Sequence, residues 1–154
     1  MANIISTDSV FSERQKQLLA MLADMMIPAG GDLPSAADPE IFVRTLQELG
    51  ANESMVVRGL TTLAERAEEK YQTSFAALDA ADRTALIDEL NTLDPVFIQV
   101  LQAGVVGSYY QDDRVLLALG LSARSPHPGG YGVPATDWSL LDPVRQRQPF
   151  YKVV

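Results

Sequence analysis

The side chains that could carry chemistry in this sequence are few, and they include a single histidine. His127 lies between Pro126 and Pro128, just ahead of a glycine-rich run that ends at Gly132. An imidazole held between two prolines could act on a substrate or cofactor as an acid, a base or a hydrogen-bond donor. A loop histidine bonded to a backbone carbonyl is the simpler interpretation, because prolines and glycines mainly give loops their shape.

The acidic side chains do not form a recognisable metal site. Asp112 and Asp113 are adjacent, as are Glu68 and Glu69, but neither pair belongs to the Glu-x-x-His units that di-iron bundles need on two helices. We interpret the aspartates as a helix cap and a first-turn acid, and the glutamates as a solvated helix face. The chain contains no cysteine, which excludes disulfides, zinc–thiolate sites, iron–sulfur clusters and thiol nucleophiles within it.

The glycines and serines also fall short of a catalytic signature. Gly129, Gly130 and Gly132 follow a predicted helix, whereas a P-loop or a dinucleotide-binding fingerprint needs a preceding strand. A Ser-His-Asp arrangement could use only His127, and no serine lies in a recognisable nucleophile elbow. The sequence therefore predicts no catalytic residue, metal ligand or cofactor-binding residue in this chain.

Two adjacent tyrosines, Tyr109 and Tyr110, end the most apolar segment of the sequence. Tyrosine is enriched at the cores of interfaces, so one interpretation is an aromatic surface that meets a partner protein. The other is core packing with one hydroxyl reaching water, and at a helix end both can hold, one for each tyrosine. In the same segment Gly104 and Gly107 would permit the close approach of another helix.

Helical spacing of apolar residues organises the chain up to about residue 120. Cap residues and Asp-Pro dipeptides mark the predicted helix starts, which are Ser12, Asp38, Asn52, Asp79, Asp94 and Asp112. The longest predicted helix is 52–71, and the most apolar, 96–110, should be central and buried. No segment alternates with a period of two, so the fold class is all-α, a compact bundle of five or six helices with an extended C-terminal tail.

The composition changes after this bundle. Residues 125–134 contain three prolines and three glycines, too many for a helix or a central strand. We therefore expect a helical bundle over residues 1–124 and an extended tail over 125–154, either part of the same domain or docked on a partner. Because an aromatic and basic tail cannot bury itself well alone, we predict a partner-binding set. Its members are Tyr109, Tyr110, His127, Pro128, Tyr131, Trp138, Arg145, Arg147, Phe150 and Tyr151.

The charge of the chain is acidic and uneven. Its 154 residues carry 20 Asp and Glu against 12 Lys and Arg, a net charge of −8 and the wrong sign for binding nucleic acid. Residues 1–94 hold 16 of the acidic side chains, whereas the chain from Arg114 onward is mildly basic. No apolar stretch is long enough to cross a membrane, and the first ten residues lack the pattern of a signal peptide.

Several segments, taken in order, resemble the gluconate 2-dehydrogenase subunit 3 family. They are FSERQKQLLAMLADMMIP (11–28), LPSAAD (33–38), the F-x-x-L and D-R of 75–90, GSYYQDDRVLLALG (107–120) and HPGGY (127–131). The resemblance implies a small, non-catalytic subunit of a flavin-dependent sugar or alcohol dehydrogenase. In such complexes a large subunit of the glucose-methanol-choline oxidoreductase type carries FAD, and electrons often leave through a cytochrome subunit.

The resemblance therefore implies a partner and not an activity of the chain alone. We expect an accessory subunit that stabilises a flavin-dependent dehydrogenase or oxidase, or assists its maturation. Family members commonly carry a twin-arginine signal, which residues 1–11 do not show. We accordingly expect a cytoplasmic location, or a periplasmic one if a leader precedes this sequence.

Two other interpretations stay open. In the first, the chain is an independent helical enzyme or small-molecule binder, with His127 and residues 109–113 lining a pocket. In the second, it is a structural interaction domain unrelated to redox chemistry. Identifying the partner would separate both from the accessory subunit.

Overall fold

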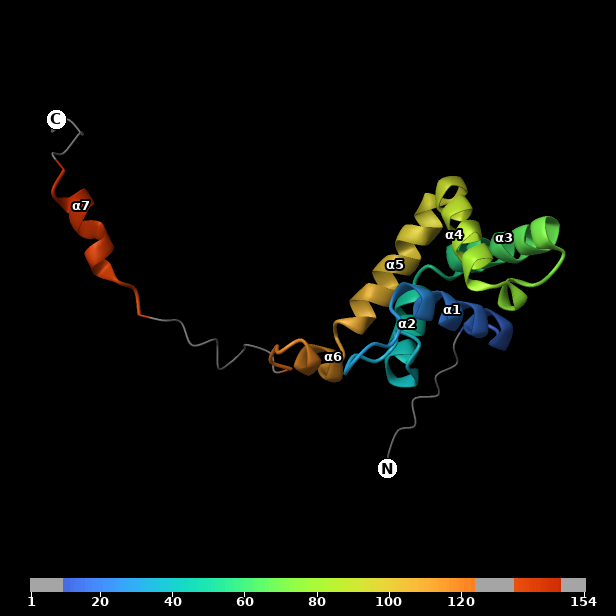
Figure 1. The fold of residues 1–154 in the computed structure, drawn as a ribbon, viewed down its shortest axis with the longest axis horizontal. Helices are drawn as coiled ribbons and strands as arrows, with labels where there is room; N and C mark the ends of the chain where they lie inside the picture. Colours follow the sequence, from blue (N-terminus) through green and yellow to red (C-terminus); the bar gives the residue numbers. More distant parts are fainter. Residues whose placement is uncertain (1–9, 124–134, 148–154) are drawn as a thin grey trace, which may run out of the picture. The chain divides into compact units, whose positions relative to one another are not determined.

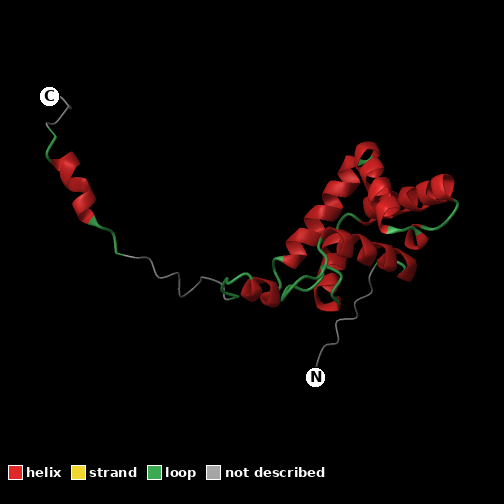
Figure 2. Cartoon of the chain, viewed as in Figure 1, coloured by secondary structure: helices red, strands yellow, loops and turns green. Residues whose placement is uncertain are grey.

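The computed structural model describes residues 10–123 and 135–147 of the chain, and these residues form helices and no strand (Figures 1 and 2). The predicted all-α fold class is confirmed. The chain divides into two compact units, Met1–Ala123 and Arg124–Val154.

The described part of the first unit contains six α-helices and one 3-10 turn. They are α1 (Glu13–Met26), α2 (Pro39–Gly50), α3 (Glu53–Tyr71), η1 (Phe75–Ala77), α4 (Ala80–Leu93), α5 (Pro95–Tyr109) and α6 (Asp113–Ala118). Five of the α-helices begin after a side chain that accepts a backbone hydrogen bond from the first turn: Ser12, Asp38, Asp79, Asp94 and Asp112. Each such bond satisfies an N–H that the helix itself leaves unpaired, which is why these starts were predictable.

Helix α5 lies at the centre of the bundle, against α2, α3 and α4. Its inner side chains Phe97, Leu101 and Val105 have no exposed surface. Two glycines let neighbouring helices come close to it. A Cβ at Gly59 of α3 would overlap the Phe97 ring, and one at Gly104 of α5 would lie 2.7 Å from Leu49 Cδ2 of α2. The close approach of another helix that was predicted at Gly104 is therefore confirmed, at the contact between α5 and α2.

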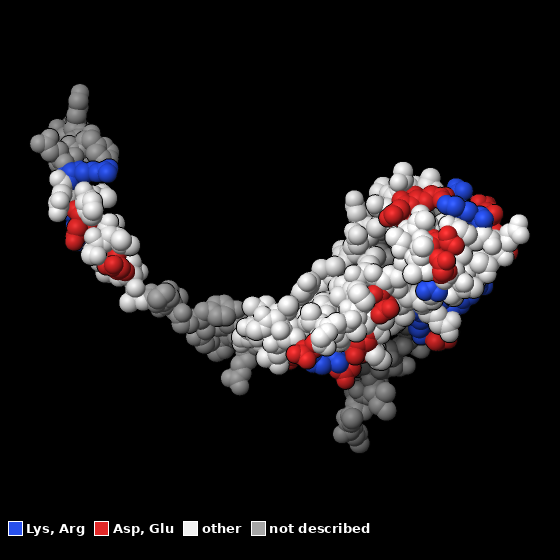
Figure 3. Space-filling model, viewed as in Figure 1, with Lys and Arg blue, Asp and Glu red and all other residues white. Residues whose placement is uncertain are grey.

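The burial predicted for α5 does not extend around the whole helix. Gly107, for which a close approach was also predicted, faces open space. Val106 is also 42 % exposed, and Leu93 at the end of α4 is 54 % exposed. In the space-filling view, charged side chains gather over α3 and α4, whereas the edge formed by α5 is almost free of them (Figure 3).

The described part of the second unit, residues 135–147, forms two short helical turns, η2 (Trp138–Leu141) and α7 (Asp142–Arg145). The sequence predicted an extended loop here, so these turns are a correction. Pro143 stands in the first turn of α7, where its fixed φ suits a helix and its missing N–H costs nothing. This is the third Asp-Pro dipeptide of the chain that opens a helix.

Candidate functional site

The loop between α1 and α2 forms one half of the candidate site. Gly30 and Leu33 exchange two backbone hydrogen bonds of 3.0 Å, and the Ala36 N–H donates to the Ile27 carbonyl at 2.9 Å. Ser35 Oγ donates to Asp24 Oδ1 at 2.6 Å. These bonds hold the loop against the end of α1.

The end of α5 is fastened to this loop. Tyr109 Oη donates to the Pro34 carbonyl at 2.9 Å, a contact between residues 75 positions apart. Tyr109 is only 2 % exposed. The segments 33–38 and 107–120, which were recognised separately in the sequence, thus lie in contact.

Arg114 joins the same two segments through ion pairs. Its Nε lies 2.9 Å from Asp112 Oδ1, and its Nη2 lies 2.8 Å from Asp38 Oδ1 and 3.4 Å from Glu40 Oε2. Asp112 and Asp38 also accept backbone hydrogen bonds as the N-caps of α6 and α2. One guanidinium therefore connects the caps of two helices that are far apart in the sequence.

The charges of this cluster are fixed near neutral pH. Hydrogen bonds from Arg114 hold the pKa of Asp112 and of Asp38 below the ordinary value, and the same bonds raise the pKa of Arg114. Burial raises the pKa of Tyr109, and the nearby Tyr110 and Asp112 add to this effect. Because the carboxylates stay charged and Tyr109 stays neutral, none of these groups is poised to exchange protons as a general acid or base. The cluster is suited to holding the fold together.

The two tyrosines divide their roles. Their rings meet edge to face, with centroids 5.4 Å apart and planes at 87°. Tyr109 belongs to the core, whereas Tyr110 is 51 % exposed. One tyrosine therefore packs in the core while the other faces outward, as one of the two interpretations of the sequence expected. Tyr110 is the tyrosine that a partner could contact.

The structure describes only some of the remaining residues in the predicted partner-binding set. Trp138 is 64 % exposed in η2, and Arg145 lies in α7 with its Nη1 3.2 Å from Asp142 Oδ1. Arg147 follows α7 and is exposed. Five members of the set lie outside the described residues: His127, Pro128, Tyr131, Phe150 and Tyr151. Partner binding by this set stays a prediction.

Sequence reasoning missed the residues that connect the cluster. It identified Asp38 and Asp112 as caps but assigned no role to Pro34 or Arg114. The available signal was the position of Arg114 two residues after a capping aspartate, where its side chain can fold back onto that carboxylate. The second carboxylate, Asp38, is 76 residues away, and no local pattern points to it.

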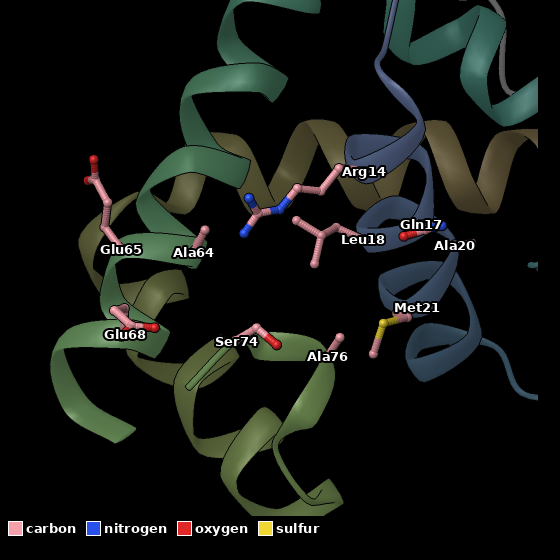
Figure 4. A pocket seen from close by; sticks show the side chains of 10 residues that line it. All are labelled: Arg14, Gln17, Leu18, Ala20, Met21, Ala64, Glu65, Glu68, Ser74 and Ala76. Carbon is pink, nitrogen blue, oxygen red and sulfur yellow. The ribbon is translucent and has the colours of Figure 1, made fainter. Parts of the chain in front are cut away.

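A separate groove of about 900 Å³ lies between α1, α3 and η1 (Figure 4). Leu18, Met21 and Ala64 give it apolar walls, and Arg14 reaches across its edge from α1 toward α3. Residues 109–113 do not line this groove, so it is not the pocket of the small-molecule alternative. Within the described ranges, no three His, Cys, Asp or Glu side chains lie close enough to hold a metal ion.

Over residues 10–123 and 135–147, no helix has both the length and the apolar character that crossing a membrane requires. No curated protein and no solved structure matches the sequence. The sequence model of the family described as gluconate 2-dehydrogenase subunit 3 matches residues 13–119, more than two thirds of the chain. The match runs from the first residue of α1 to the residue that caps the end of α6, and it includes both halves of the Arg114 cluster. The chain therefore belongs to the gluconate 2-dehydrogenase subunit 3 family.

Proposed function

We propose that this chain is the small accessory subunit of a flavin-dependent dehydrogenase or oxidase that acts on a sugar or another alcohol. It stabilises the large catalytic subunit, a flavoprotein of the glucose-methanol-choline type that carries FAD, or assists its maturation. The family match over residues 13–119 carries this proposal, because it spans every α-helix described in the first unit.

The organisation of the Arg114 cluster supports a binding role over a catalytic one. Tyr109, Asp112 and Asp38 are all engaged in contacts within the bundle, and their pKa shifts oppose any change of charge near neutral pH. A bundle braced in this way presents a rigid surface, and a rigid surface loses little conformational entropy when a partner binds.

The second unit supplies further apolar contact area for a partner. Four large apolar side chains are exposed within the seven residues 138–144: Trp138, Leu140, Leu141 and Val144. We propose that these side chains bind the large subunit and that the basic Arg145 contacts it at the edge of the same interface. A cytochrome subunit that accepts electrons from the flavin would complete the complex.

Co-expression with the large flavoprotein tests the proposal. We expect the catalytic subunit produced without this chain to be less soluble, to contain less FAD per protein and to lose alcohol-dependent dye reduction. A large subunit that folds, binds FAD and turns over equally well alone would overturn it. So would alcohol oxidation by the purified small chain.

A further inference from the structure

The outer face of α5 carries no charged side chain along its whole length. Val96, Gln99, Ala103, Val106 and Tyr110 follow one another at spacings of three and four residues, so they form one line along the helix, here named the α5 stripe. All five are exposed, including half of the Val96 side chain. In Figure 3 the edge of the bundle along α5 is almost free of charged side chains.

This absence of charge is unusual for a helix face in contact with water, which is ordinarily polar and charged. The sequence from Pro95 to Gln111 contains no Asp, Glu, Lys or Arg. The bundle around it is rich in them, with 17 acidic and 8 basic side chains between residues 10 and 123. The α5 stripe is therefore an uncharged line on a strongly acidic body.

The stripe is also held rigidly from behind. The inner face of α5 is the centre of the core, where Phe97, Leu101 and Val105 have no exposed surface. At the C-terminal end of the stripe, the Tyr110 ring packs edge to face on Tyr109, which is bonded to the loop before α2. A surface fixed in this way is preorganised for a partner.

We propose that the α5 stripe docks the large catalytic subunit, against an uncharged apolar surface of that subunit bordered by basic side chains. The inference rests on the proposed function and specifies which face carries it. A charge opposite the stripe would lose its hydration and find no counter-charge on α5, so the partner surface must be uncharged there. Around the stripe the acidic body favours a basic border on the partner.

A second copy of this chain is a poorer occupant. The stripe of a 15-residue helix is about 22 Å long and about 10 Å wide, or roughly 200 Å² per copy, against about 800 Å² per partner in a stable complex. Two acidic bundles also repel each other. A larger partner can extend the contact to the exposed side chains that follow α5, Leu117, Leu119 and Leu121.

A pair of matched substitutions tests this assignment. Val106→Glu places a carboxylate in the stripe, and Thr61→Glu places the same side chain on the exposed outer face of α3. Both replace an exposed β-branched residue, so both variants should keep the helical circular dichroism and melting temperature of the wild type. We expect Val106→Glu to weaken binding of the tagged large subunit at least tenfold, and Thr61→Glu to leave it within about twofold.

Gln99→Glu, which adds a charge without a change of shape, should also weaken binding by several-fold. Equal binding by Val106→Glu and the wild type would overturn the assignment of the face while leaving the proposed function in place. Failure of the wild type to bind the large subunit would instead overturn the proposed function. Sedimentation of the small chain alone gives a third readout, because a wild-type dimer that Val106→Glu dissociates would assign the stripe to a second copy.

Discussion

Helices α3 and α5 cross where Gly59 meets the Phe97 ring, and each buries an apolar inner face, yet their outer faces differ completely. The outer face of α3 carries ion pairs, such as Lys70 Nζ with Glu89 Oε2 of α4 at 2.9 Å. The outer face of α5 carries none, because α5 contains no charged side chain. Inner faces therefore determine how the bundle folds, whereas outer faces are free to suit different surroundings.

The difference between the two outer faces has little effect on the stability of the bundle. Exposed ion pairs such as that of Lys70 contribute little to folding, since water and salt screen them. The charged side chains of α3 favour contact of that face with water. The uncharged outer face of α5 can be buried against another protein without the loss of hydrated charges. Substitutions on the two helices can separate these effects.

The largest effect should follow from the shared inner contact. Phe97→Ala removes a ring with no exposed surface that packs on both helices, and we expect the free energy of unfolding to fall by about 3–5 kcal/mol. Urea denaturation followed by circular dichroism measures it. A loss below about 1 kcal/mol would mean that α3 and α5 do not depend on each other.

Glycine-to-alanine changes should have opposite signs on the two helices. Gly59→Ala forces the Phe97 ring to move, and we expect a loss of about 1–3 kcal/mol in spite of the better helix propensity. Gly107→Ala on the outer side of α5 meets nothing within 4 Å and should gain about 0.5–1 kcal/mol. The same urea denaturation experiment measures both changes. If both substitutions change the free energy of unfolding in the same direction, the close contact of α3 and α5 at Gly59 is contradicted.

The cap of α6, just after the C-terminal end of α5, should make the stability of the bundle depend on pH. Asp112→Ala removes the cap of α6, and we expect a loss of about 1 kcal/mol at pH 7. Because the pKa of Asp112 is lower in the folded chain than its ordinary value of 3.8, its contribution is present above that value and is lost as the pH falls through the folded value. Thermal melts between pH 7 and pH 2 should therefore bring wild type and variant closer together below about pH 4.

The smallest effect concerns the C-terminal end of α3. Gln72 adopts a left-handed conformation with φ of 55°, which costs a residue with a Cβ more than it costs glycine. Gln72→Gly should raise the free energy of unfolding by up to about 1 kcal/mol, partly offset by the greater freedom of glycine in the unfolded chain. If the variant is less stable than the wild type, the Gln72 side chain stabilises the fold by more than its left-handed backbone conformation costs.

Much of the fold could be predicted because its signals are local. A cap such as Asp79 or Asp94 acts on N–H groups within three residues, so the helix start can be read from a short stretch. The direction that each side of a helix faces depends on its neighbours, and for this reason the close approach predicted at Gly107 was wrong. The turns η1 and α7 are too short to show a periodic pattern.

The candidate site was predictable only in pieces. The sequence singled out Tyr109, Tyr110 and the two segments 33–38 and 107–120. It did not show that these two segments are in contact. The hydrogen bond from Tyr109 to Pro34 and the pair of Arg114 with Asp38 depend on the folded arrangement of residues about 75 positions apart. The family resemblance preserved the order of these segments without showing that they touch.

The guanidinium of Arg114 also determines where mechanical load would enter the bundle. Helix α6 is the last helix described before Ala123, and Arg114 in its first turn is tied to Asp38 at the start of α2. A pull on the chain beyond Ala123 would therefore be shared between α6 and the N-terminus of α2, and would not be borne by the end of α5 alone. Force that a partner applies to the C-terminal unit would then reach the start of α2 as well as the end of α5.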